Sequence, residues 1–290
     1  MSAGHSTARA YPAALVLGAV ASVQSGAALA TRLFDDLGPA GTVLLRTLFA
    51  ALLLAAIWRP TLGGHPARHL RAAAVFGASL AGMNLCFYEG LDRLPLGVAV
   101  TLEFVGPLGV ALIGSRTRLD LVWAALAGLG IVLLWGGAGG GGVDALGAVL
   151  VIVAGVFWGA YILIAGRVGR IFPGGSGLAL AMAFSTLLVL PAGLAGGGSS
   201  LLDPRLAAIG LAVAVLSSVI PYSLELEALR RLPAGVFGVL MSLEPAIAAL
   251  IGFLALGQQL SSREVVAVAL VVTASAGALR SGAGPPPLEQ

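Results

Sequence analysis

Apolar residues run through this chain in long stretches, separated by short segments rich in Pro, Gly and Arg. Most stretches are close to the roughly 20 residues that a helix needs to cross a bilayer. The breaks between them predict ten transmembrane helices, at residues 12–31, 41–58, 70–90, 97–114, 120–136, 144–165, 175–195, 206–228, 234–256 and 262–279. We therefore expect an all-α integral membrane protein.

The first predicted helix also resembles a signal peptide. Arg9 precedes its apolar run, and the run ends in Ala28-Leu29-Ala30, which is similar to a cleavage site. We favour a retained helix, because its removal would leave nine helices and unbalance the two halves of the chain described below.

The composition also indicates a membrane protein. Of the 290 residues, 58% are hydrophobic and only 10% are charged, whereas about a quarter of the residues of a soluble domain are charged. A net charge of +3 would suggest a nucleic-acid partner in a soluble protein, but here most arginines fall in loops between apolar runs. We expect the lipid bilayer and a small-molecule substrate as partners, no nucleic acid, and a monomer or homodimer.

All 16 basic residues are arginines, and Ala and Gly abound, as GC-rich codons produce. This bias indicates a bacterial protein, which we expect to be a multi-pass protein of the inner membrane. The single cysteine, Cys86, excludes an intramolecular disulfide and a multi-cysteine metal site. We expect no metal and no cofactor, and the lack of Gly-x-Ser-x-Gly and His-Glu-x-x-His motifs argues against an enzyme.

Arginine placement predicts the orientation, because cytoplasmic loops of membrane proteins are enriched in basic residues. With a cytoplasmic N-terminus, the cytoplasmic loops hold Arg9, Arg59, Arg68, Arg71, Arg116, Arg118, Arg167, Arg170, Arg230, Arg231 and Arg280. The opposite loops hold only Arg32, Arg93, Arg205 and Arg263. We therefore expect both termini in the cytoplasm.

An internal repeat divides the chain into two halves. Residues 89–98 read EGLDRLPLGV, and residues 227–236 read EALRRLPAGV, at an offset of 138. The same offset continues without a gap as far as Pro107, which corresponds to Pro245. Five helices per half is an odd number, so the second half is inverted, as in many secondary transporters that bind substrate between their repeats. The predicted domains are a tail at 1–11, repeats at 12–137 and 143–280, and a tail at 281–290. The glycine-rich run 136–142 is the predicted loop between the repeats.

Several segments resemble the drug/metabolite transporter superfamily of the EamA type. They are residues 21–27 (ASVQSGA), 82–88 (GMNLCFY), 95–107 (PLGVAVTLEFVGP), 220–225 (IPYSLE) and 237–246 (FGVLMSLEPA). Within it they look most like the branch of the bacterial threonine/homoserine exporters. The resemblance implies ten helices in two inverted repeats, a central cavity and export of small amino acids driven by a proton gradient. Another metabolite or drug, such as an aromatic amino acid or a purine, a lipid flippase and an intramembrane enzyme stay open as alternatives.

Four ionisable residues fall inside predicted helices, where a charge costs roughly 2.5–3.5 kcal/mol. They are Glu103, Glu225, Glu244 and Arg46. The carboxylates are candidates for binding a substrate ammonium group or a coupling proton, since the histidines lie outside the predicted helices; the alternative is a structural pairing with Arg46 or a backbone amide. Arg46 itself either extends to the outer surface or forms a gating pair with an acid.

Three prolines are predicted to interrupt helices at a cavity, because proline cannot donate to the carbonyl four residues earlier. Pro107, Pro221 and Pro245 free the carbonyls of Glu103, Ser217 and Met241, respectively. A bilayer tolerates a free carbonyl only where protein or a wet cavity satisfies it. Kinks without a binding role are the alternative.

Helical spacing adds polar and aromatic neighbours to these residues. The further candidates for the site are Gln24, Asn84, Tyr88, Trp158, Tyr161, Tyr222 and Met241. Hydrogen bonding between helices or plain packing is the alternative for each. The glycine pairs Gly128 and Gly130, and Gly155 and Gly159, are expected to allow close helix packing.

Overall fold

The computed structural model describes residues 3–61, 65–113, 118–135, 143–229, 231 and 234–282. The predicted loop at 136–142 and most of the predicted C-terminal tail lie outside the described residues. Within the described part of the chain every regular element is a helix and none is a strand. This agrees with the all-α prediction.

The first half contains α1 (Ala3–Ala30), a 3-10 turn η1 (Thr31–Leu33), α2 (Phe34–Trp58), α3 (Ala67–Leu91), α4 (Leu96–Glu103), α5 (Val105–Ile113) and α6 (Arg118–Trp135). The second half contains α7 (Ala145–Ile171), α8 (Ser176–Gly197), a 3-10 turn η2 (Gly198–Leu202), α9 (Pro204–Ala214), a π-helical turn η3 (Val215–Val219), α10 (Ile220–Leu229), α11 (Ala234–Met241), α12 (Glu244–Leu256) and α13 (Ser262–Gly282). Each predicted segment thus coincides with a helix or with consecutive helices.

Local signals explain where several helices begin and end. The side chain of Asp144 accepts a hydrogen bond of 2.6 Å from the backbone N–H of Gly147 and caps α7. Asp203 caps α9 in the same way, followed by Pro204 at the first helical position. Such caps satisfy donors that the first turn of a helix leaves unpaired. Gly257 ends α12 with a left-handed φ of 66°.

The described chain is a multi-span membrane protein. Six stretches are long and apolar enough to cross a bilayer: Tyr11–Trp58, Ala67–Leu91, Ala145–Ile171, Ser176–Leu202, Pro204–Glu225 and Val236–Leu256. The first of them contains α1 from Tyr11 onward and the whole of α2. Large apolar side chains such as Leu52, Leu163 and Leu254 are exposed on the outside of the bundle, where lipid would cover them.

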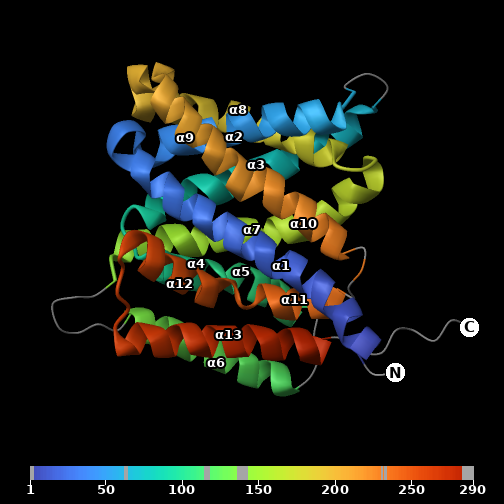
Figure 1. The fold of residues 1–290 in the computed structure, drawn as a ribbon, viewed down its shortest axis with the longest axis vertical. Helices are drawn as coiled ribbons and strands as arrows, with labels where there is room; N and C mark the ends of the chain where they lie inside the picture. Colours follow the sequence, from blue (N-terminus) through green and yellow to red (C-terminus); the bar gives the residue numbers. More distant parts are fainter. Residues whose placement is uncertain are drawn as a thin grey trace, which may run out of the picture.

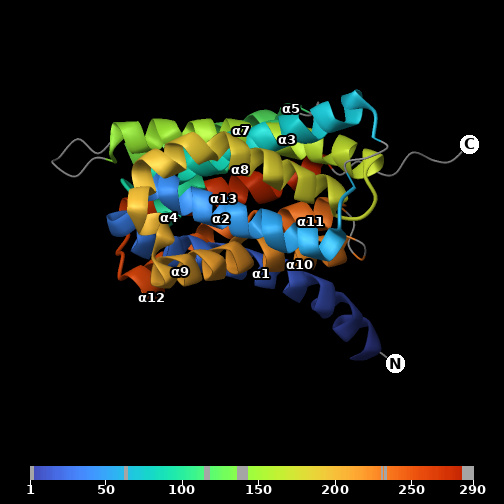
Figure 2. The ribbon, with the colours of Figure 1, turned by 90° about the horizontal axis from the view of Figure 1, so that it is seen from above.

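Most helices lie side by side with their axes roughly aligned (Figures 1 and 2), whereas α1, α9 and α10 run obliquely across them in Figure 1. The main packing pairs are α2 with α8, α3 with α7 and α8, α1 with α10, α4 with α12, and α6 with α13. The first turn of α1 and the last turn of α13 lie at the same end of the bundle, on the right of Figure 1.

Two helices break beside the predicted prolines. α4 ends at Glu103 and α5 begins at Val105, while α11 ends at Met241 and α12 begins at Glu244. The residues within the breaks include Phe104 and Ser242, which are separated by the repeat offset of 138. The interruption before Pro221 takes a different form, the π-helical turn η3, and such turns often mark functional positions.

A close crossing of α5 and α7 holds the first break in place. A Cβ atom built on Gly155 would overlap the backbone carbonyl of Glu103, and one built on Gly106 would overlap the carbonyl of Gly155. The close packing predicted for Gly155 and Gly159 is therefore present. The same prediction is wrong for Gly128, because no described atom lies within 4 Å of a Cβ built there.

The second helix starts earlier than predicted. We expected it at residue 41, but α2 begins at Phe34 and continues across a kink at Gly38, whose φ of 64° is left-handed. Gly38 and Pro39 look like a loop in the sequence, yet proline is tolerated in the first turn of the helical segment that follows the kink. Arg46 consequently lies about two turns beyond Pro39, deeper in the helix than we expected.

Candidate functional site

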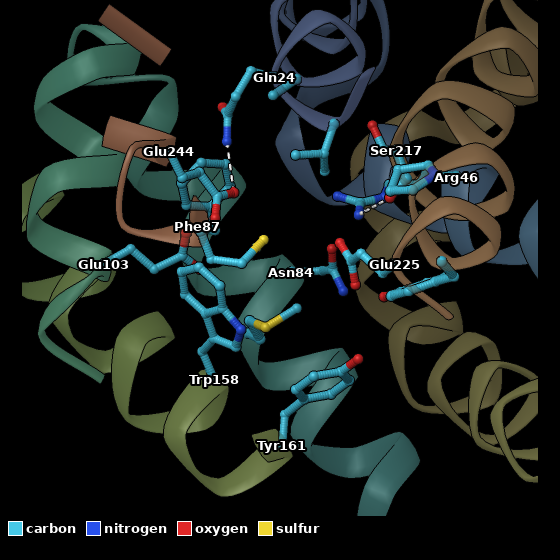
Figure 3. A pocket seen from close by; sticks show the side chains of 16 residues that line it. Gln24, Arg46, Asn84, Phe87, Glu103, Trp158, Tyr161, Ser217, Glu225 and Glu244 are labelled. Carbon is cyan, nitrogen blue, oxygen red and sulfur yellow. Dashed lines mark hydrogen bonds between the residues drawn. The ribbon is translucent and has the colours of Figure 1, made fainter. Parts of the chain in front are cut away.

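A cavity of about 120 Å³ lies between α1, α2, α3, α7, α10 and the two broken helices. Figure 3 shows the side chains that surround it. They are Val23, Gln24, Ala27, Arg46, Met83, Asn84, Phe87, Glu103, Trp158, Tyr161, Ser217, Pro221, Tyr222, Glu225, Met241 and Glu244. The cavity therefore collects charged, amide and aromatic side chains that are far apart in the sequence.

Most of the predicted site residues line this cavity. They are Gln24, Arg46, Asn84, Glu103, Trp158, Tyr161, Pro221, Tyr222, Glu225, Met241 and Glu244. Three predicted residues do not: Tyr88 is fully buried behind Arg46, Pro107 lines a neighbouring cavity, and Pro245 is buried in the first turn of α12.

Five lining residues were not predicted: Val23, Ala27, Met83, Phe87 and Ser217. Ala27 lies three residues after Gln24, and Phe87 lies three residues after Asn84. Helical spacing from the polar residue of each helix would have found these two.

One wall of the cavity carries two carboxylates, Glu103 and Glu244, as Figure 3 shows. Their residues are only 8% and 6% exposed. The side-chain nitrogen of Gln24 donates a hydrogen bond of 2.9 Å to Oε1 of Glu244. Oε2 of Glu244 and Oε1 of Gln24 are buried and have no hydrogen-bond partner. Among the described residues, two buried acceptor atoms at this wall thus lack a donor.

The break between α11 and α12 explains the position of Glu244. It is the first residue of α12, and the dipole at the start of a helix favours a negative charge. Glu103 is instead the last residue of α4, where the helix dipole favours a positive charge. The two acids therefore stand at opposite ends of their helices.

Arg46 lies on the opposite wall of the cavity (Figure 3). Its Nη1 donates to the hydroxyl of Tyr88 at 3.1 Å, and its Nη2 donates to the carbonyl of Ser217 at 3.2 Å. The guanidinium also stands 5.4 Å from the centre of the Tyr88 ring. Pro221 cannot donate to the carbonyl of Ser217, and the side chain of Arg46 donates to this carbonyl.

The expectation that Arg46 extends to the outer surface is wrong. The residue is 7% exposed and points into the bundle, where Tyr88 and the carbonyl of Ser217 hold its guanidinium. Nor does Arg46 form an ion pair with a carboxylate of the described residues. Its hydrogen-bond partners among the described residues are neutral oxygens, and an aromatic ring lies beside it.

Tyr88 supports Arg46 from outside the cavity. Its ring packs against Phe34 and Phe87, with centroid distances of 5.7 Å and 6.0 Å. Asn84, one turn earlier on α3, donates to its own helix at the carbonyl of Leu80, at 2.7 Å. Of the two candidate residues on α3, Asn84 therefore lines the cavity and Tyr88 lies in the layer behind it.

Two further cavities adjoin the central one. The first has a volume of about 280 Å³ and a largely apolar lining that includes Phe104, Pro107 and Phe237. The second has about 190 Å³ and lies beside Phe76 and Phe172. Tyr161 and Glu225 line all three cavities, so these two side chains lie where the cavities meet.

Comparison with known proteins adds to this geometry. The profile of the EamA-like transporter family matches residues 145–280. The threonine/homoserine exporters RhtA of Salmonella typhimurium strain LT2 and of Escherichia coli strain K12 are each 40% identical over 267 residues. The alignments cover 92% of this chain and 90% of each relative. These relatives are named transporters, not enzymes.

A solved crystal structure shares the fold. It aligns with a TM-score of 0.65 at 18% sequence identity, over 93% of this chain and 96% of the other. The arrangement of the helices around the cavity therefore recurs in a protein whose sequence is quite different.

Proposed function

We propose, since this chain belongs to the EamA-like transporter family, that it exports small amino acids of the threonine and homoserine class from the bacterial cytoplasm. The observation that carries this proposal is the small, charged cavity between the broken helices. Its volume of about 120 Å³ is close to the roughly 150 Å³ of a cavity that holds benzene. Drug-sized ligands occupy about 300–1,000 Å³, so the central cavity suits a small amino acid better than a drug.

The architecture that we propose is ten transmembrane helices in two inverted repeats. The repeat offset relates α1 to α7, α2 to α8, α3 to α9 and α10, α4 and α5 to α11 and α12, and α6 to α13. The packing pairs correspond under this offset. The pair α3 with α7 corresponds to α10 with α1, and the pair α3 with α8 corresponds to α9 with α2. The pairs α2 with α8 and α6 with α13 map onto themselves, and the pair α1 with α12 corresponds to α7 with α5. A two-fold relation between the halves accounts for all of these pairs.

The orientation that we propose places both termini in the cytoplasm of a bacterial inner membrane. The ends of α2, α7 and α10 lie at the same end of the bundle as the start of α1 (Figure 1), and Arg59, Arg170 and Arg231 stand at or just beyond them. A green fluorescent protein fused after residue 290 should fluoresce, because it folds in the cytoplasm, and alkaline phosphatase at the same position should be inactive. The reverse pattern would refute this orientation.

We assign proton coupling to Glu103. Histidine is absent from the lining of the cavity, which leaves carboxylates as the groups that exchange protons in a buried site. Glu244 is already bonded to Gln24 and stands where the helix dipole favours its charge. Glu103 stands where the dipole favours a bound cation or proton, and alternating access around the cavity would expose it to each side in turn.

Proteoliposomes with an imposed pH gradient test both the substrate and the coupling. We expect radiolabelled L-threonine to move against its gradient in the wild-type protein. Glu103→Gln should lower this driven transport at least about tenfold, yet retain exchange of threonine across the membrane. Glu264→Gln, which changes a half-buried carboxylate in the first turn of α13, away from the central cavity, is the matched control and should behave like the wild type.

The possible results separate the two claims. If the wild-type protein moves no small amino acid, the proposed substrate class is wrong. If Glu103→Gln retains full gradient-driven transport, the assignment of the proton site is wrong, and the substrate class stands.

A second candidate function is export of a larger solute, such as an aromatic amino acid. The apolar cavity of about 280 Å³ beside the central one favours it, because the two share Trp158, Tyr161, Glu225 and Met241. A large side chain could occupy this apolar space. Competition by phenylalanine, tryptophan and adenine against labelled threonine distinguishes the candidates, since a transporter of threonine alone is not inhibited by them.

A further inference from the structure

One wall of the central cavity carries a positive charge that has no carboxylate partner among the described residues. The opposite wall carries hydrogen-bond acceptors that lack donors there. On one side Arg46 is 7% exposed and has no carboxylate partner among the described residues. A guanidinium has five N–H donors and stays protonated in proteins. The hydrogen bonds to Tyr88 and Ser217 use two of those donors, and the remaining ones are available to an anion that enters the cavity.

The opposite wall has the complementary arrangement. Gln24 holds Glu244 through Oε1, and Oε2 of Glu244 and Oε1 of Gln24 are both buried without a partner. Both residues are at least nine-tenths buried. A buried acceptor without a donor carries a free-energy cost, and a ligand with several N–H donors would remove that cost at both atoms.

We propose that one α-amino acid binds between these walls as a zwitterion, with its carboxylate on Arg46 and its ammonium group on Glu244 and Gln24. This assignment rests on the proposed function and specifies how the substrate class is recognised. The planar guanidinium matches a carboxylate with two parallel hydrogen bonds. The ammonium group supplies three donors, and two of them match the free oxygens of Glu244 and Gln24.

The geometry also gives the zwitterion a role in transport. Arg46 belongs to α2, and Glu244 belongs to α12, so they come from different repeats. A ligand that carries both charged groups on one carbon atom joins the two walls, whereas a ligand with one charged group contacts only one. Amino acids would therefore be selected over simple amines and acids of the same size.

Two size-matched fragments of threonine test this pairing. 1-Amino-2-propanol lacks the carboxylate, and 3-hydroxybutanoate lacks the ammonium group. Equilibrium binding to the purified protein in lipid nanodiscs should be at least about tenfold tighter for L-threonine than for either fragment, as expected for a charged hydrogen-bonded contact. Glycine, alanine and serine complete the panel.

Two variants test the carboxylate contact and the ammonium contact separately. Arg46→Met should weaken binding of L-threonine at least about tenfold and leave binding of 1-amino-2-propanol within twofold. Glu244→Gln should weaken L-threonine similarly and leave 3-hydroxybutanoate within twofold. Arg46→Lys keeps the positive charge and should restore part of the affinity. If Arg46→Met does not fold, the pairing can still be tested with Arg46→Lys, with Glu244→Gln and with the two fragments on the wild-type protein.

The outcomes distinguish the pairing from the substrate class. Equal weakening of threonine and both fragments in Arg46→Met, or equal affinity of the wild type for threonine and a fragment, overturns the pairing and leaves the proposed export of threonine intact. Binding of alanine or serine but not threonine, with the expected pattern of variants, supports the pairing and refutes the substrate. If no α-amino acid binds, the pairing is wrong.

Discussion

The crossing of α5 and α7 allows a direct test of how tightly Glu103 is positioned. Gly155 has no side chain, and a Cβ atom added to it would overlap the carbonyl oxygen of Glu103 and lie 3.3 Å from the backbone nitrogen of Gly106. Both neighbours are backbone atoms at the break between α4 and α5. They cannot rotate away as the end of a flexible side chain can, so Gly155→Ala must push α4 and α5 away from α7.

The magnitude follows from a comparison with Gly128→Ala on α6. Both changes replace a helical glycine by alanine, which favours the helix by about 1 kcal/mol. A Cβ on Gly128 has no described atom within 4 Å, so only this gain remains and the protein should become slightly more stable. At Gly155 overpacking costs about 1–3 kcal/mol. The free energies of unfolding of the two variants should therefore differ by that amount, with Gly155→Ala the less stable.

Unfolding of both variants in the same detergent measures this difference, because the membrane-mimetic environment is then shared. Gly155→Ala should also transport threonine more slowly, since the displaced backbone carries Glu103, and Gly128→Ala should transport normally. Equal stability and equal transport of the two variants would show that the crossing is not as close as described and that it does not position Glu103.

Two further predictions concern the other interrupted segments. Pro221→Ala places a backbone donor within reach of the carbonyl of Ser217, in competition with Arg46. We expect the free energy of unfolding to rise by up to about 3 kcal/mol, which denaturant unfolding measures, and threonine to bind more weakly, which a calorimetric titration measures. Gln258→Leu removes the acceptor of the Leu96 N–H, bonded at 2.9 Å where α4 meets α12; it should cost about 1–3 kcal/mol in denaturant unfolding, and no loss would refute a stabilising role for this bond.

Much of the cavity lining could be predicted because polar residues in a bilayer are costly. A glutamine or an asparagine inside an apolar helix is a local signal that needs no knowledge of the rest of the chain. Gln24, Asn84 and Glu103 stand out in this way, and each lines the cavity. The same reasoning fails for Tyr88, because an amphipathic ring can satisfy its hydroxyl behind the cavity as well as in it.

Apolar lining residues carry no such signal. Met83 and Phe87 contact the cavity, while Leu163 and Leu254 are exposed on the outside of the bundle, yet all four are ordinary residues of an apolar helix. In a water-soluble protein the burial pattern would separate inside from outside, but lipid is as apolar as a protein core. Which face of a membrane helix lines a cavity is decided by its packing partners, and these come from distant parts of the chain.

The contacts of Arg46 could not be predicted from the sequence either, because they too come from distant parts of the chain. The sequence predicts that Pro221 frees the carbonyl of Ser217, but the side chain that donates a hydrogen bond to this carbonyl is 171 residues away. Since a neutral carbonyl and a tyrosine hydroxyl hold the guanidinium, its positive charge is not cancelled as an ion pair with an acid would cancel it. A gating pair with Glu103 or Glu225 would leave the cavity without a free cation. The proline thus has a chemical consequence beyond a bend, because it supplies the neutral acceptor that keeps Arg46 in place and leaves its charge for a ligand.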